Sequence, residues 1–179
     1  RAYTRIEPRV MENVQLSSEM QVVGQAVRDG KSYQVINVIG SRLFKRMIAE
    51  EKWEEASEIA RWQVKNGAHV VDVCLQTSDR DELNDIDPFY AKLMPKIKAP
   101  VMVDTTDPRS IESALVWCQG KGIINSINLE DGEEKFERVC PLAKSYGAAL
   151  EGGTIDEDTQ QGQAFTRERK LAVAQRSVQ

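Results

Sequence analysis

The stretch Val101-Met-Val-Asp-Thr-Thr-Asp-Pro108 contains a short strand, a polar turn and the start of a helix. Its first three residues are apolar, as in strands that are buried on both faces of a parallel sheet. Asp107 followed by Pro108 is typical of a helix start, because aspartate accepts hydrogen bonds from free backbone N–H groups and proline needs no donor there. The stretch therefore predicts a strand that is closely followed by a helix.

The same unit recurs along the chain. Further apolar or β-branched runs lie at 35–39, 69–73, 123–127 and 148–155, the last interrupted by Glu151 and two glycines. Helices are predicted from Trp53 to Asn66-Gly67, from Asp87-Pro88 onward, from Phe136 to Gly147, and from near Thr166. Strands that alternate with helices through short connections predict right-handed βαβ units, a parallel sheet and an α/β fold.

The composition narrows the classes of function. The 179 residues carry 24 basic and 28 acidic side chains, and 41% are hydrophobic, which indicates an ordinary soluble domain. We expect no membrane span, because apolar runs stay far below about 18 residues, and no nucleic-acid partner, because the net charge is −4 without a basic block. The start lacks the apolar segment of a signal peptide. The three cysteines lack CxxC spacing, so a reducing cytoplasm is expected and no metal site is predicted.

Three polar residues at the carboxyl ends of predicted strands are candidate binding residues: Asp72, Asp104 and Asn125. These ends face the ligand crevice in parallel α/β folds. A buried carboxylate is costly unless it is paired or meets a ligand. Either aspartate could instead cap the next helix, but Asp107 is the better cap in its loop, which leaves Asp104 without a structural task. Two carboxylates and an amide could bind a ring with several N–H donors.

Six segments of the chain are informative when taken together: Asn37–Arg46, Ala60–Asp72, Val101–Thr106, Gln119–Ile127, Glu130–Phe136 and Tyr146–Ala149. In combination and order they resemble the pterin-binding, or folate, domains of cobalamin-dependent methionine synthases. The resemblance implies a TIM-type (β/α)8 barrel of the pterin-binding family. Because the predicted strands start about every 28 residues, eight units would need roughly 225 residues. We therefore expect an incomplete barrel of about five βα units at 35–179, preceded at 1–34 by a linker and an N-terminal helix after Ser18.

The resemblance also implies a function. The chain would bind 5-methyltetrahydrofolate and present its methyl group to cob(I)alamin, as part of a methyltransferase that makes methionine from homocysteine. Asp104 and Asn125 would match family residues that hydrogen-bond the pterin ring, and Asp72 the acidic residue of the second strand. The expected partners are the folate itself and the cobalamin-binding and homocysteine-binding domains of the same enzyme. No catalytic residue is assigned.

The sequence also departs from this family. Gly40 runs directly into Ser41 where relatives carry a longer loop, Cys74 replaces an asparagine, and Glu151 stands at an apolar strand position. Two alternatives stay open. One is a dihydropteroate synthase-like pterin enzyme, which would need an anion site for pyrophosphate. The other is a catalytically inactive barrel fragment that acts only in assembly.

Overall fold

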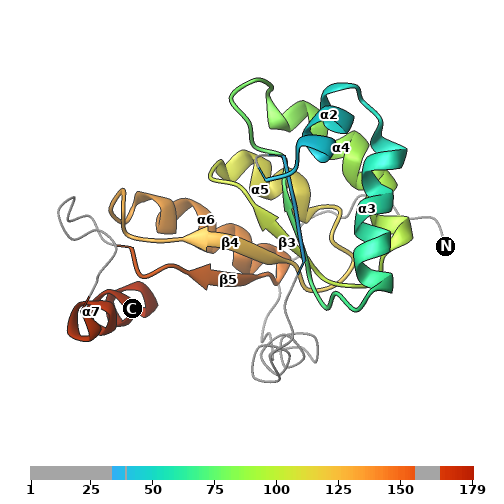
Figure 1. Cartoon of the computed structure of the whole chain (residues 1–179). Helices are drawn as coiled ribbons and strands as arrows, with labels where there is room; N and C mark the ends of the chain where they lie inside the picture. Colours follow the sequence, from blue (N-terminus) through green and yellow to red (C-terminus); the bar gives the residue numbers. More distant parts are fainter. Residues whose placement is uncertain (1–33, 39, 156–165) are drawn as a thin grey trace.

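A parallel sheet of five strands forms the centre of the computed structural model, which describes residues 34–38, 40–155 and 166–179 (Figure 1). The strands are β1 (Gln34–Asn37), β2 (Val71–Cys74), β3 (Val101–Asp104), β4 (Ile123–Ile127) and β5 (Ala149–Gly152). Each strand pairs in parallel with the next one along the chain. The predicted α/β fold with a parallel sheet is confirmed, whereas the helix predicted after Ser18 lies outside the described residues.

The strand order β1-β2-β3-β4-β5 contains no reversal. Right-handed crossovers that always step in the same direction place their helices on one face of the sheet, as in a β/α barrel, whereas a doubly wound sheet reverses its order. The helices are α2 (Arg42–Ala49), α3 (Trp53–Lys65), α4 (Glu82–Leu93), η1 (Met94–Lys96), α5 (Pro108–Leu115), α6 (Glu134–Tyr146) and α7 (Arg167–Val178). Helices α2 to α6 pack in succession around the sheet. This is the arrangement expected of an incomplete barrel.

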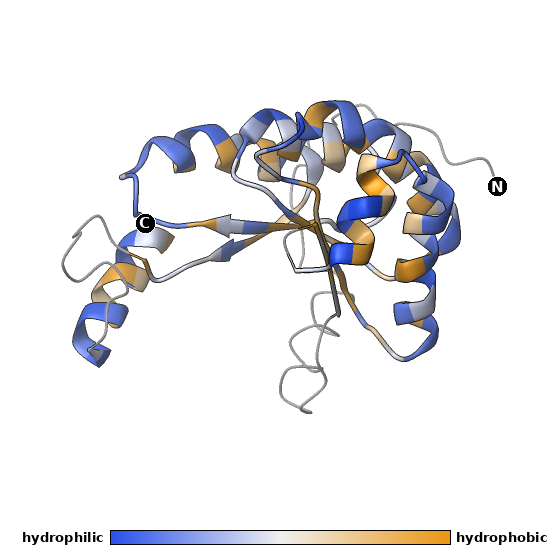
Figure 2. Cartoon of the chain, turned by 45° about the horizontal axis from the view of Figure 1, so that its top comes forward, coloured by the Kyte–Doolittle hydropathy of each residue, from blue (hydrophilic) through white to orange (hydrophobic). Residues whose placement is uncertain are grey.

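The main hydrophobic core lies between the sheet and these helices. Val73, Val103 and Ile124 of the strands are buried in the same cluster as Phe44 of α2 and Phe89 of α4. The two phenylalanine rings meet edge to face with centroids 5.6 Å apart, a favoured aromatic geometry. Figure 2 shows hydrophobic residues on the strands and on parts of the helices. Hydrophilic residues lie on the other sides of the helices.

A second, smaller apolar cluster contains the alternate strand residues. Val70, Met102 and Ile123 are buried there, with Ala149 packed against them. Because successive side chains of a strand point to opposite faces, these residues lie on the face that α2 to α6 do not cover. They form the inner layer of the barrel on which the candidate site rests.

The predicted helix ends are correct at four places. Asp107 caps α5 by accepting a hydrogen bond from the Arg109 backbone nitrogen at 2.9 Å, with Pro108 at the first helical position. Gly67 after α3 and Gly147 after α6 have φ angles of 97° and 66°. Such left-handed positions at helix ends are readily filled by glycine because it has no Cβ atom. Thr166 caps α7 through the Arg169 nitrogen.

The helix start predicted at Asp87-Pro88 is wrong. Helix α4 begins at Glu82, where the Asp81 side chain accepts a hydrogen bond from the Leu83 nitrogen at 3.1 Å, and Pro88 lies inside the helix. Because the true cap lies six residues upstream, Asp87 is left to accept a hydrogen bond from the Trp117 indole nitrogen at 2.7 Å.

No helix in the described part of the chain is long and apolar enough to cross a membrane.

Helix α2 was not among the sequence-based predictions. It follows β1 after a short turn, and the Ser41 side chain caps it by accepting a hydrogen bond from the Phe44 nitrogen at 3.2 Å. The helix has only eight residues and two fully buried side chains, Phe44 and Ile48. An apolar period this short is difficult to distinguish from a loop in the sequence.

Candidate binding site at the carboxyl ends of the strands

The predicted site residues lie on one face of the sheet. The strand register aligns Asp104 of β3 with Asn125 of β4, and Asp72 of β2 with Met102 of β3. Met102 belongs to the inner apolar cluster, so Asp72 lies on the inner face as well. Residues two positions apart along a strand share a face, which places Asp104 there with Met102. The structure therefore brings all three predicted residues together above the apolar inner layer.

A direct hydrogen bond joins two of these residues. The Asn125 side-chain nitrogen Nδ2 donates to Oδ2 of Asp72 at 3.1 Å. Asp72 is 2% exposed, and its other oxygen, Oδ1, has no hydrogen-bond partner among the described residues. A buried carboxylate oxygen without a donor is costly, and such an atom calls for a specific explanation. A ligand with an N–H group could supply the donor that this oxygen lacks.

The electrostatics of the site follow from burial and from carboxylates that lie close together. The pKa of Asp72 is raised to about 6, chiefly by burial and then by the negative charges of Asp104 and Glu151, while the Asn125 hydrogen bond opposes the rise. Burial also raises the pKa of Asp104, while a hydrogen bond from the Cys74 thiol and the positive charge of Lys135 lower it. The site therefore favours ligands that donate hydrogen bonds or carry positive charge.

Two charged residues of the site were not predicted as such. Glu151 follows Ala149 by two positions on β5, and the register shift between β4 and β5 places it opposite Asn125 and Ser126. The alternation of β5 could have placed Glu151 on this face, although the sequence showed it only as an interruption of the strand. Lys135 is half-buried at the start of α6. Burial lowers its pKa, while nearby acidic groups oppose this shift. Nothing in the sequence indicates that this helical lysine lies near Asp104.

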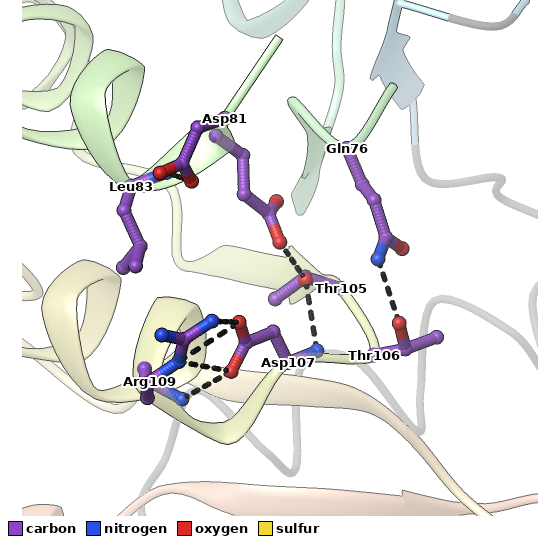
Figure 3. A network of polar contacts seen from close by, with 8 residues as sticks. Gln76, Asp81, Leu83, Thr105, Thr106, Asp107 and Arg109 are labelled. Atoms are coloured by element: carbon purple, nitrogen blue, oxygen red, sulfur yellow. Dashed lines mark hydrogen bonds and ion pairs between the residues drawn. The ribbon is translucent and has the colours of Figure 1, made fainter. Parts of the chain in front are cut away.

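The loops behind the site are joined by hydrogen bonds between polar side chains (Figure 3). The Gln76 side-chain nitrogen donates to the Thr106 hydroxyl at 2.7 Å. The Thr105 hydroxyl donates to Oε1 of Glu82 at 2.5 Å and accepts from the Asp107 backbone nitrogen at 3.3 Å. Together these bonds hold Thr105, Thr106 and Asp107, the three residues that directly follow Asp104. Sequence reasoning missed Glu82, because a glutamate in the first turn of a helix is usually an exposed partner of the helix dipole.

The chemistry available at this site is hydrogen bonding and charge stabilisation. Burial and the charge of Asp104 raise the pKa of Cys74 to about 12, so the thiol stays protonated at neutral pH and is a poor nucleophile. Among the residues that the structure describes, no group of three or more His, Cys, Asp or Glu side chains could hold a metal ion. The arrangement is suited to binding a polar ring and to stabilising positive charge on it.

Comparison with known proteins places the chain in a family. Residues 33–178 match the family described as pterin binding enzyme. The chain is 32% identical over 145 residues to methionine synthase from Mycobacterium tuberculosis and 34% identical over 145 residues to methionine synthase from Mycobacterium leprae. Each alignment covers 79% of this chain but only 12% of the relative, so the chain spans a small part of the length of these proteins.

Proposed function

Because the chain belongs to the pterin binding enzyme family, we propose that Asp72, Asp104 and Asn125 bind the pterin ring of 5-methyltetrahydrofolate. The observation that carries this proposal is the buried Asp72 carboxylate, whose Oδ2 accepts a hydrogen bond from Asn125 and whose Oδ1 has no partner among the described residues. The pyrimidine part of a pterin presents several N–H donors along one edge. Ionised carboxylates accept from such donors, and an asparagine can both donate and accept.

The reaction that we propose is the transfer of the folate methyl group, as one step in making methionine from homocysteine. The methyl-bearing nitrogen N5 is a poor leaving group until it is protonated, so a site that favours the protonated pterin in the transition state accelerates the transfer. The carboxylates of Asp72 and Asp104 supply this bias, because their negative charge stabilises a cation on the ring. These residues bind the pterin, orient it and favour the proton at N5.

The methyl acceptor belongs to another part of the enzyme in this proposal. Cob(I)alamin, when bound, would supply the nucleophile that takes the methyl group. The carboxylate and amide oxygens of this site fit the N–H edge of a pterin, so we assign the corrin to a separate cobalamin-binding domain. A homocysteine-binding domain would complete the enzyme. The names of the relatives and the small share of their length that this chain spans support these partners.

The experiment that tests the proposal is calorimetric titration of the full-length protein with 5-methyltetrahydrofolate. We expect saturable binding that Asp104→Ala weakens by about 1–3 kcal/mol, because hydrogen bonds to a charged group are lost. Glu112→Gln, at an exposed position of α5, is the matched control and should bind like the wild type. A wild-type protein that does not bind the folate, or an Asp104→Ala variant with unchanged affinity, would contradict the proposal.

Methyl transfer needs its own measurement. The absorbance change of cob(I)alamin on methylation by 5-methyltetrahydrofolate should be seen with the wild type and be strongly reduced in Asp104→Ala. Release of pyrophosphate from a pterin pyrophosphate in the presence of aminobenzoate would instead favour a dihydropteroate synthase-like enzyme. Folate binding without either reaction would leave binding alone as the function of this site.

A further inference from the structure

Glu82 and Thr105 form a buried pair directly behind the proposed pterin site. The Thr105 hydroxyl donates to Oε1 of Glu82 at 2.5 Å, and the two residues are 4% and 7% exposed. Thr105 follows Asp104 immediately, while Glu82 belongs to the first turn of α4. This hydrogen bond therefore connects the end of β3 to the element that follows β2.

The role of Glu82 is not explained by helix capping. Asp81 already caps α4 by accepting a hydrogen bond from the Leu83 nitrogen at 3.1 Å. A carboxylate next to a helix N-terminus gains dipole stabilisation while exposed to solvent, so burying Glu82 adds a desolvation cost that the helix does not require. The buried position of Glu82 indicates a task outside α4.

The backbone after Asp104 is held by this pair. The Thr105 oxygen accepts from the Asp107 backbone nitrogen at 3.3 Å, and Asp107 in turn caps α5 (Figure 3). Since the hydroxyl proton is donated to Glu82, Thr105 connects the first turn of α4 with the start of α5. Asp104 is the last residue of β3, so the sheet holds it from one side and Thr105 from the other.

Two further observations place this connection at the site. Gln76 Nε2 donates to the Thr106 hydroxyl at 2.7 Å, so a second hydrogen bond ties the loop after β2 to the loop after β3. Glu82, Asp104 and Thr105 also line the same small cavity of about 10 Å³. Asp72 lies on β2 and Asp104 on β3. The two cross-loop hydrogen bonds therefore fix the ends of the two strands that carry the carboxylates.

We propose that Glu82, acting through the Thr105 hydroxyl, is a positioning residue that holds the Asp104 carboxylate in place for the pterin. This inference rests on the proposed function. It does not require Glu82 to touch the ligand. A binding group must be held to within about 0.5 Å of its productive geometry by residues behind it, so loss of the Thr105 hydroxyl should reduce affinity without removing any ligand contact.

Variants of Thr105 in the full-length protein test this inference. Thr105→Val removes the hydroxyl at similar volume, and Thr105→Ser keeps it. We expect the valine variant to weaken 5-methyltetrahydrofolate binding about tenfold and the serine variant to stay within about threefold of the wild type. Ser57→Ala is the matched control, because it removes a fully buried hydroxyl of α3 that donates to the Glu54 carbonyl at 2.8 Å. This control should lower the melting temperature and leave the affinity unchanged.

A double-mutant cycle distinguishes positioning from a general loss of stability. If Thr105 acts through Asp104, the valine substitution should change affinity less than twofold in an Asp104→Ala background. A full tenfold loss in that background, or an unchanged affinity of Thr105→Val beside a weakened Asp104→Ala, would overturn the inference. If the valine variant does not fold, Glu82→Met compared with Glu82→Gln gives the same cycle and the same criteria.

Failure of the proposed function gives a different result. If the wild-type protein does not bind 5-methyltetrahydrofolate at all, the proposed function is overturned and the inference with it. If the wild type binds and Asp104→Ala weakens binding while every Thr105 and Glu82 variant behaves like the wild type, only the inference is overturned.

Discussion

The side-chain nitrogen of Asn125 lies 3.1 Å from Oδ2 of Asp72, although 53 residues separate the two in the chain and β3 runs between their strands. Neighbouring strands are about 4.8 Å apart, so these side chains bridge two strand spacings across the inner face of the sheet. The bond spans the strand that carries Asp104. Strands β2, β3 and β4 therefore present one continuous polar surface, on which the pKa of Asp72 depends on both Asp104 and Asn125.

Asn125→Ala should change the pH dependence of folate binding. The Asn125 hydrogen bond lowers the pKa of Asp72, which burial raises to about 6, so its loss should raise that pKa further. Binding that needs an ionised Asp72 should then be lost at a higher pH as the solution is acidified. Dissociation constants measured from pH 5.5 to 8 should show this shift relative to the wild type. An unchanged or lower midpoint would contradict it.

Asp72→Asn should stabilise the folded protein at neutral pH. The folded-state pKa of about 6 lies above the usual 3.8, so between these values the folded state binds more protons than the unfolded state and stability falls as the pH rises. Asparagine removes this penalty, which is on the order of 3 kcal/mol well above pH 6. The variant should melt at a higher temperature than the wild type at pH 7.5 and at nearly the same temperature at pH 4. Its folate affinity should fall. A lower melting temperature at pH 7.5 would disprove the penalty.

The fold could be predicted because its signals are local. Four of the five strands lie in short apolar runs between turn residues, and Asp107-Pro108 starts a helix where predicted. The same Asp-Pro pair does not start a helix at Asp87-Pro88, because α4 is already capped by Asp81. The buried side chains of α4 keep Pro88 inside the helix. A capping pattern indicates where a helix can begin, whereas packing decides where it does.

The site was predictable only in part, for a similar reason. Asp72, Asp104 and Asn125 interrupt apolar strands, and the alternation of a strand places them on one face. Glu82 and Lys135 lie on helices, and their approach to Asp104 depends on how those helices pack against the sheet. No period in the sequence carries that information. The strand residues proposed to bind the ligand could therefore be predicted, while the helix residues behind them could not.

Arg80→Leu should destabilise the fold strongly. Arg80 makes two hydrogen bonds to the Asp85 carboxylate, Nε to Oδ2 at 2.9 Å and Nη2 to Oδ1 at 2.7 Å, and Asp85 is 1% exposed. Removing the arginine leaves a buried charge without its partner, which costs about 3–5 kcal/mol. Arg109→Ala breaks an exposed ion pair with Asp107 and should cost less than about 1 kcal/mol. Melting temperatures that fall equally in both variants would contradict this difference.

Cys74 should resist alkylation in the folded protein. Burial and the charge of Asp104 raise the pKa of its thiol to about 12, and only the thiolate reacts. At pH 8 iodoacetamide should leave Cys74 unmodified in the native state and modify it in urea, as mass spectrometry of the digested protein would show. Because Asp104 contributes to the raised pKa, Asp104→Asn should speed the labelling, whereas Glu112→Gln should not. Rapid native labelling of the wild type would show a reactive thiol and contradict the raised pKa. Slow labelling that Asp104→Asn accelerates would identify Cys74 as a packed hydrogen-bond donor to the Asp104 carboxylate.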